Sequence, residues 1–483
     1  AHKNMALAGQ VSYNWKYRYF IDVNFGYNGS ENFADGHRFG FFPAASAAWN
    51  IQREKFMQNL TWLDMFKIRY SYGKVGNDRL MDGNNQIRFP YLYTIDYVTH
   101  KVDDKDEKKP VYNFGNLGTP TRPDYQHGVH YTALASKNVT WEESTKQDVG
   151  IDLAMFHNTF SLTVDYFHEK RTGIYMRRNF LPGILGLEQS PWANVGSVKS
   201  EGFDGHFRYE NRFGDVVLTV RGNMTYSKNT ILDYDVENNV YPYQFQTGHR
   251  VNQLRGLVAE GLFADYDDIR NSPKQMFGDV QPGDIKYKDV NGDGVVDDGD
   301  VVAIGATTTP NLIYGIGASV NWRGFDFNVH FQGAGKSSVL LGGKTVWAFS
   351  QDRYGQILSD MVEDRWVDKE TAATLGIPAN ENPNAAYPRL VLCENGASHN
   401  NYRPSSYWMR DISYVRLKNL EVGYSLPKDL VSRIHFENVR FFLQGANLLT
   451  FSDFKLWDPE MGSDNGEKYP LTKSITVGLQ VNL

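Results

Sequence analysis

The sequence predicts an all-β protein whose roughly 13 antiparallel strands form the wall of a transmembrane β-barrel. Apolar and polar residues alternate with a period of two along many segments. One face of these segments is rich in aromatic and aliphatic residues, whereas the other carries charged and amide residues at mid-strand. The links between segments alternate between a few residues and roughly 70 or more, the pattern of short periplasmic turns and long external loops.

The amino-acid composition gives further evidence about the class of protein. The chain has 483 residues, 14% aromatic residues and a net charge of −6. No run of about 18 apolar residues predicts a transmembrane helix, but membrane strands need only about 10 alternating residues. The small charge and the absence of a basic stripe argue against a nucleic-acid partner. The single cysteine, Cys393, excludes a disulfide framework and a thiolate metal site within the chain, and we interpret it as passive.

The strands follow one another in a regular order. They are expected at 8–16, 19–28, 38–51, 64–74, 147–157, 159–169, 200–211, 214–228, 310–322, 324–333, 410–426, 438–447 and 473–483. Short links follow the first, fifth, seventh and ninth of these; a tight Arg323-Gly324 turn is the ninth link. Long links follow the fourth, eighth and tenth, and soluble domains seldom contain several loops of that length.

The number of strands and the polarity of their faces lead to two further expectations. If the last strand ends in the periplasm, every short link falls on the periplasmic side and every long link outside. A closed single-chain barrel normally has an even number of strands, so an odd count predicts further strands upstream. The polar faces are expected to line the lumen, with Asp165, Arg221, Asn223, Asp326, Asn328 and His330 among the lining residues.

Five blocks of sequence resemble a known family. They are 30–56, with Phe42-Pro43 and Ser46 to Trp49; 66–78; 138–156; 412–427, with Tyr414 to Asn419; and 439–462, with Asn447-Leu448 and Asp458-Pro459-Glu460. Together they resemble, nearly end to end, the SusC/RagA family of TonB-dependent outer-membrane transporters. The chain ends in Leu483, where members of that family usually end in an aromatic residue.

The resemblance implies that residues 1–483 are the C-terminal portion of a TonB-dependent receptor-like barrel of about 22 strands, with the plug domain absent from this chain. It also implies import of a nutrient oligomer, a glycan in preference to a peptide, across the outer membrane of a Gram-negative, Bacteroidota-like bacterium. The implied partners are the membrane lipid, an oligosaccharide or peptide substrate, and a SusD-like surface lipoprotein that acts as a lid. TonB would supply energy through the missing N-terminal part.

The segment 289–300, DVNGDGVVDDGD, lies in the predicted extracellular loop 229–309 and has the spacing of an EF-hand calcium loop. Gly294 stands at position 6, where a sharp turn is needed. Several aspartates this close repel one another without a cation. The predicted Ca²⁺ ligands are the side chains of Asp289, Asn291, Asp293, Asp297 and Asp300 and the backbone carbonyl of Val295.

The flanks of this acidic loop are not those of a calcium sensor. Pro282-Gly283 precedes it and a β-branched stretch follows, so the helix pair that a sensor moves is not expected. We therefore predict a structural Ca²⁺ that holds the loop, weakened because Asp300 replaces the usual Glu. A solvated turn without metal is the alternative.

Enzymatic motifs are absent. The sequence has no His-Glu-x-x-His, no Walker loop and no Gly-x-Ser-x-Gly, and the loop carboxylates form no recognisable glycosidase pair, so we predict no enzyme. Aromatic and polar residues at 241–249, 350–356 and 400–411 suit contacts to sugars or peptides, although a structural role is favoured for each residue. The alternatives from other classes are a secreted calcium-stabilised β-rich adhesin or glycan-binding protein, and a surface glycosidase.

Overall fold

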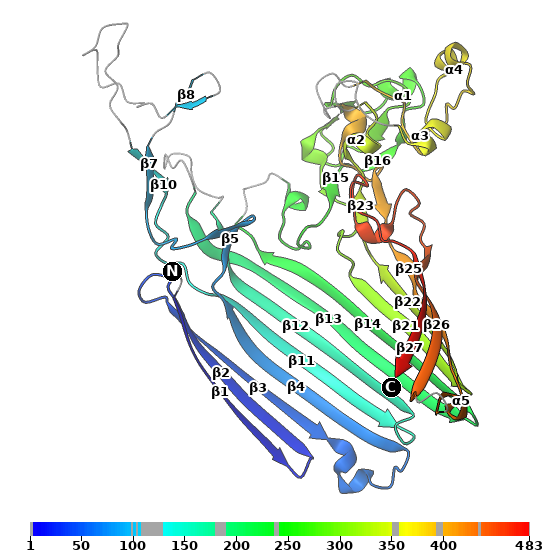
Figure 1. Cartoon of the computed structure of the whole chain (residues 1–483). Helices are drawn as coiled ribbons and strands as arrows, with labels where there is room; N and C mark the ends of the chain where they lie inside the picture. Colours follow the sequence, from blue (N-terminus) through cyan, green and yellow to red (C-terminus); the bar gives the residue numbers. More distant parts are fainter. Residues whose placement is uncertain are drawn as a thin grey trace.

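The computed structural model describes residues 3–97, 100–102, 105–107, 129–178, 190–235, 241–349, 357–392, 399–432 and 436–482. Within them, thirteen strands form one antiparallel sheet in which each strand pairs with the next member in sequence order (Figure 1). These strands confirm the thirteen predicted ones. They are β1 (Asn4–Trp15), β2 (Tyr19–Ser30), β3 (Phe39–Asn50), β4 (Leu63–Asn77), β11 (Glu142–Met155), β12 (Phe160–Arg177), β13 (Trp192–Phe213), β14 (Val216–Asp233), β21 (Leu312–Trp322), β22 (Phe325–Gly335), β25 (Tyr414–Ser425), β26 (Asn438–Phe451) and β27 (Ser474–Asn482).

Three central strands extend well beyond their predicted ends. Strand β12 continues to Arg177, β13 begins at Trp192 and β14 continues to Asp233. The pairing shifts register between Arg171 and Ile174 and again next to Ser197. Such bulges interrupt the two-residue alternation, which is why the periodicity in the sequence stops before the strands do. The first residues of the segment 229–309 therefore belong to β14.

The strand register aligns the apolar residues of the whole sheet on one face. Tyr70 lies opposite Val149, Val149 opposite Tyr166, Tyr166 opposite Phe203, and Phe203 opposite Tyr226. The same face continues to the last strand, where Leu443 lies opposite Val477. A sandwich would pack such a face against a second sheet. Here Val149 is 46% exposed and Val477 82% exposed, as expected of side chains that contact lipid.

Aromatic side chains gather where the strands meet the short turns. The rings of Trp15 and Tyr19 are 5.7 Å apart, and those of Tyr19 and Trp49 are 6.3 Å apart. At the other side of the sheet, the Phe325 ring lies 6.1 Å from Trp322. Aromatic girdles of this kind sit at the membrane surface, so this edge of the sheet marks one interface.

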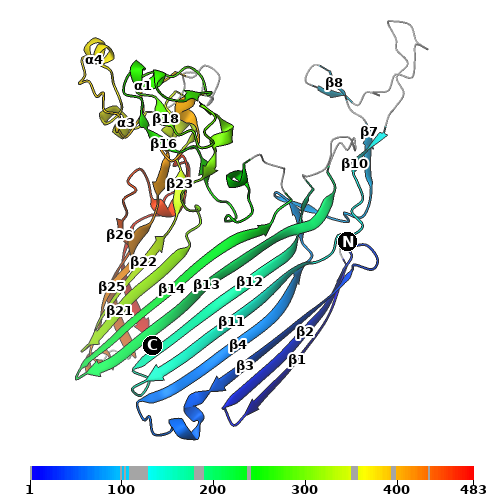
Figure 2. The same ribbon diagram turned by 180° about the vertical axis from the view of Figure 1, so that it is seen from behind.

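A compact lobe stands over the long-loop ends of β21, β22 and β25 (Figures 1 and 2). We call it the cap; it is built from residues 254–309, 338–349, 357–392 and 399–412. Its buried core includes Leu257, Ile285, Tyr287, Val296 and Trp408. Apart from the first residues of the strand predicted at 410–426, the sequence predicted only loops here, because elements of two to seven residues leave no periodic pattern.

The short elements complete the fold. Those of the cap are β15 (Arg255–Gly256), β16 (Ala259–Leu262), β17 (Lys274–Gln275), β18 (Ile285–Tyr287), β19 (Val295–Val296), β20 (Val302–Ala303), β23 (Ser338–Leu340), β24 (Met409–Asp411), α1 (Tyr266–Arg270), α2 (Gly343–Val346), α3 (Ser359–Glu363) and α4 (Lys369–Leu375), with 3-10 turns at Asp298–Asp300 and Asn400–Tyr402. Elsewhere lie β5 (Leu80–Asp82), β6 (Asn85–Ile87), β7 (Thr94–Tyr97), β8 (His100–Val102), β9 (Lys105–Glu107), β10 (Val129–Ala133) and α5 (Lys428–Val431), with 3-10 turns at Ile51–Arg53, Lys55–Met57, Pro242–Gln244 and Pro459–Met461. Among the described residues, no helix is long and apolar enough to cross a membrane.

Candidate functional site: the polar face and the cap

The second face of the sheet is polar, and the register places all six predicted lumen residues on it. His330 lies opposite Gly317, which in turn lies opposite Arg221. Asn223 lies opposite His206, and Asp165 lies opposite Asp204, on the same face of β13. Asp326 and Asn328 alternate with outward Phe325 and Phe327 on β22. Because the other face contacts lipid, this polar face is the one that turns to the lumen.

Ion pairs connect neighbouring strands along the polar face. Arg69 on β4 places Nε 2.8 Å from Asp152 Oδ2 on β11 and Nη2 2.9 Å from Asp165 Oδ1 on β12. Gly150 leaves the space for this cluster, since a Cβ there would stand 2.0 Å from Asp165 Oδ1. Asp165 is predicted from the sequence but its partner Arg69 is not, because a partner 96 residues away is identified only by the strand register.

A second cluster links the last strands. Arg440 on β26 donates from Nε to Asp326 Oδ1 on β22 at 3.0 Å and also pairs with Glu421 on β25. Of these three residues, only Asp326 is predicted from the sequence as a lumen residue. The cluster fastens three successive strands by charge-assisted hydrogen bonds, which are stronger than neutral ones.

A buried arginine at the start of β25 anchors the loop between β26 and β27. Arg416 is 1% exposed, and its Nη2 lies 2.5 Å from Asp458 Oδ1 and 3.7 Å from Glu460 Oε2. Tyr414 to Asn419 and Asp458-Pro459-Glu460 are two of the sequence blocks that carry the family resemblance. The ion pair gives a physical reason for both blocks, because a buried guanidinium needs a carboxylate partner.

The cap is held together by a buried polar network. Asp284 is fully buried; its carboxylate lies 2.7 Å from Arg389 Nε and accepts hydrogen bonds from Asn401 Nδ2 at 2.7 Å and from the Gln281 backbone N–H at 2.8 Å. Gln275 Nε2 donates to Asn400 Oδ1 at 2.7 Å. The network therefore ties three segments that are far apart in sequence into one unit.

In two of the three aromatic segments, side chains have the structural role that was favoured for them. In 400–411, Tyr402 is 4% exposed and Trp408 1% exposed, and Trp408 Nε1 donates to the Asn401 carbonyl at 2.7 Å. In 241–249, the Tyr243 hydroxyl donates to the Gly299 carbonyl at 2.7 Å, and burial together with Asp300 raises the Tyr243 pKa. The segment 350–356 and Cys393 lie outside the described residues.

The acidic loop 289–300 is closed by its own carboxylates. Asp300 is fully buried and accepts from the Val290 and Asp297 backbone N–H groups at 2.7 and 2.9 Å. Asp289 accepts from the Gly292 and Gly294 N–H groups at 2.6 and 2.9 Å. The turn at Gly294, φ +88°, has the sharp backbone that the spacing predicted.

The same residues can be compared with what a Ca²⁺ ion requires. Asn291 and Asp293 accept from backbone N–H groups two residues ahead, at 2.9 and 3.0 Å, and Asp297 accepts from the Gly299 N–H at 2.6 Å. Val295 lies in the short strand β19. Each oxygen keeps a second lone pair for a cation. In the described part of the chain, however, no three acidic or histidine side chains converge in a metal-binding arrangement. The donor chemistry fits Ca²⁺; the side-chain geometry would have to tighten around it.

Comparisons with known proteins agree with this architecture. No protein-family model matches the chain. TonB-dependent receptor P3 of Formosa agariphila is 25% identical over 99% of this chain and 45% of its own length. The TonB-dependent receptor SusC of Bacteroides thetaiotaomicron is 21% identical over 98% of this chain and 43% of its own length. The structure of the RagAB peptide transporter superposes with a TM-score of 0.72 and 18% identity, covering 99% of this chain and 48% of that one.

The sheet, its lipid-facing apolar face and its polar inner face define the chain as part of the wall of a transmembrane β-barrel. In sequence the chain is similar to TonB-dependent receptors, SusC among them, and in fold to the RagAB structure, in agreement with the resemblance found in the sequence. The chain spans about half the length of the curated relatives that it matches. These relatives are named as receptors, in agreement with the prediction that the chain is not an enzyme.

Proposed function

We propose that the protein to which this chain belongs imports nutrient oligomers across the outer membrane, with TonB supplying energy and a SusD-like lipoprotein closing the extracellular side. The observation that carries this proposal is a continuous lipid-facing sheet whose other face is polar and ion-paired, as a solute pathway requires. The similarity to TonB-dependent receptors supports the energy source and the partner.

An oligosaccharide is the first candidate substrate, and a peptide is the second. The sequence favours the oligosaccharide through its aromatic and amide-rich loops. The peptide is favoured by the fold shared with the RagAB peptide transporter. A deletion strain separates the two: growth on oligosaccharides as the sole carbon source should fail while growth on peptides continues. The opposite pattern would make the peptide the substrate, and normal growth on both would contradict import.

The lid partner has its own test. Gentle detergent extraction of the tagged receptor should recover a surface lipoprotein in an amount equal to that of the receptor. A receptor that purifies alone from cells expressing its neighbouring genes would contradict the partnership.

We also propose that the loop 289–300 binds a structural Ca²⁺ through the six groups named above, supported by its spacing and its concentration of carboxylates. Removing calcium with a chelator, or combining Asp289→Ala with Asp293→Ala, should speed amide hydrogen exchange in 284–305 while the strands of the barrel stay protected. Asp267→Ala, in the same lobe but outside the loop, is the matched control. Unchanged exchange after chelation would mean that the loop is a solvated turn.

A further inference from the structure

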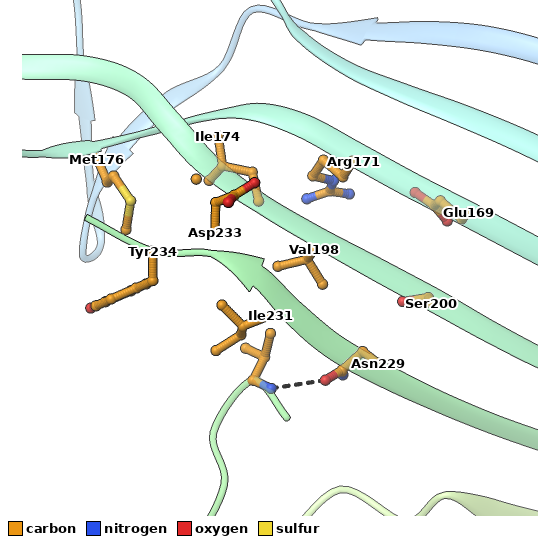
Figure 3. A pocket seen from close by; sticks show the side chains of 12 residues that line it. Glu169, Arg171, Ile174, Met176, Val198, Ser200, Asn229, Ile231, Asp233 and Tyr234 are labelled. Atoms are coloured by element: carbon orange, nitrogen blue, oxygen red, sulfur yellow. Dashed lines mark hydrogen bonds between the residues drawn. The ribbon is translucent and has the colours of Figure 1, made fainter. Parts of the chain in front are cut away.

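A recess opens on the polar face near the long-loop ends of β12, β13 and β14 (Figure 3). Its volume is about 430 Å³. Glu169 lies opposite Ser200 and Ser200 opposite Asn229, while Arg171 lies opposite Val198. These positions continue the polar face that carries Asp165 further along the same strand. The recess therefore faces the lumen close to the extracellular rim.

The floor of the recess is aliphatic and its wall carries one cation. Figure 3 shows the Arg171 guanidinium above Val198, between Ile174 and Glu169. Tyr234 stands at the edge and is 39% exposed. The remaining apolar lining comes from Met176, Ile231 and Val251.

Arg171 differs in its ion pairing from the other two arginines near the same end of β12. Arg177 Nη2 lies 2.8 Å from Asp82 Oδ2, and Arg178 Nε lies 3.0 Å from Asp235 Oδ2. Arg171 is exposed, and its guanidinium makes no hydrogen bond or ion pair within the described part of the chain. Its guanidinium therefore keeps its donors for a ligand.

The carboxylates that line the recess already have partners. Glu169 Oε1 accepts from Ser144 Oγ at 2.6 Å, and Glu169 Oε2 lies 3.8 Å from Lys146 Nζ. Asp233 accepts a hydrogen bond from Ser197. Ser144, Lys146 and Ser197 thus engage the two carboxylates, whereas the Arg171 guanidinium keeps its donors beside an apolar surface.

We propose that this recess binds a carboxylate-bearing unit of the incoming oligomer. The planar guanidinium of Arg171 would hold the carboxylate through two parallel hydrogen bonds, and the aliphatic floor would pack against the body of that unit. A uronate in an oligosaccharide and the C-terminus of a peptide both supply this chemistry. The ligand's origin as an imported oligomer rests on the proposed function, whereas binding can be measured without transport.

The test measures binding to the complete receptor in detergent by isothermal titration calorimetry. The probes are two matched pairs: trigalacturonic acid with its methyl ester, and N-acetyl-trivaline with its amide. In at least one pair the acid should bind about tenfold more tightly than its neutral partner, because a charge-assisted pair contributes about 1.4 kcal/mol or more. The pair that shows the difference identifies the source of the carboxylate.

Variants then locate this preference. Arg171→Gln should abolish the difference between acid and neutral probe. Arg323→Gln, which removes an exposed arginine from the short turn between β21 and β22 at the other end of the sheet, should preserve it. Val198→Trp should weaken both members of the pair by filling the floor, with circular dichroism as the check on folding.

Equal binding of acid and neutral probes in both pairs, or an acid preference that survives Arg171→Gln, would overturn the proposal. A receptor that binds the acid through Arg171 but supports no growth on any oligomer would contradict the proposed import. It would not contradict the proposal that the recess binds a carboxylate.

Discussion

Asp284→Ala is expected to destabilise the cap by about 3–5 kcal/mol. Asp284 is fully buried and pairs with Arg389, while Asn401 and the Gln281 backbone also donate to it. The substitution leaves a guanidinium, whose side chain is only 21% exposed, without its counter-charge. Amide hydrogen exchange resolved along the sequence should show faster exchange in 281–287 and 399–402 with unchanged protection in the barrel strands.

The matched control for this prediction is Asp267→Ala in the same lobe. Asp267 pairs with Arg270 at the surface, and its side chain is 76% exposed. Exposed pairs contribute little, so this variant should exchange as the unmodified protein does. If Asp284→Ala behaved like Asp267→Ala, the buried network would not be what holds the cap together.

The second large effect is expected on the lipid-facing side. Val23→Arg, near the middle of β2, should destabilise the barrel by about 2–4 kcal/mol, because it places a charge in the hydrocarbon region. Val23 is 50% exposed and lies opposite Val11 and Ala45 on the apolar face. Reversible unfolding of the complete receptor in lipid vesicles measures the change.

The neighbouring residue supplies the control. Asn24 lies on the polar face opposite Gln10 and Ala44, so Asn24→Arg should leave barrel stability nearly unchanged. Similar losses for both variants would contradict the assignment of the two faces. A larger loss for Asn24→Arg would reverse it.

The cap could not be predicted as a folded unit from the sequence. Leu257 and Ile285 come from the loop between β14 and β21, and Leu341 and Trp408 from the loop between β22 and β25, yet they form one core. Each segment alone is too short and irregular to show a period. Tyr402 and Trp408 illustrate the consequence. The composition of their segment suits contacts to ligands, but both side chains are buried and pack the lobe, in the structural role that was favoured for them.

The sequence by itself determined the strands, their order and the face to which each side chain belongs. Alternation is a local property that is visible within about 10 residues, and the register of the strand pairs preserves it outside the bulges. Only the tertiary structure decided which polar residues meet: Arg69 with Asp152, Arg416 with Asp458, and the unpaired Arg171 above its aliphatic floor. Such partners are set by strand register, bulges and loop closure across tens of residues, and no local pattern encodes them.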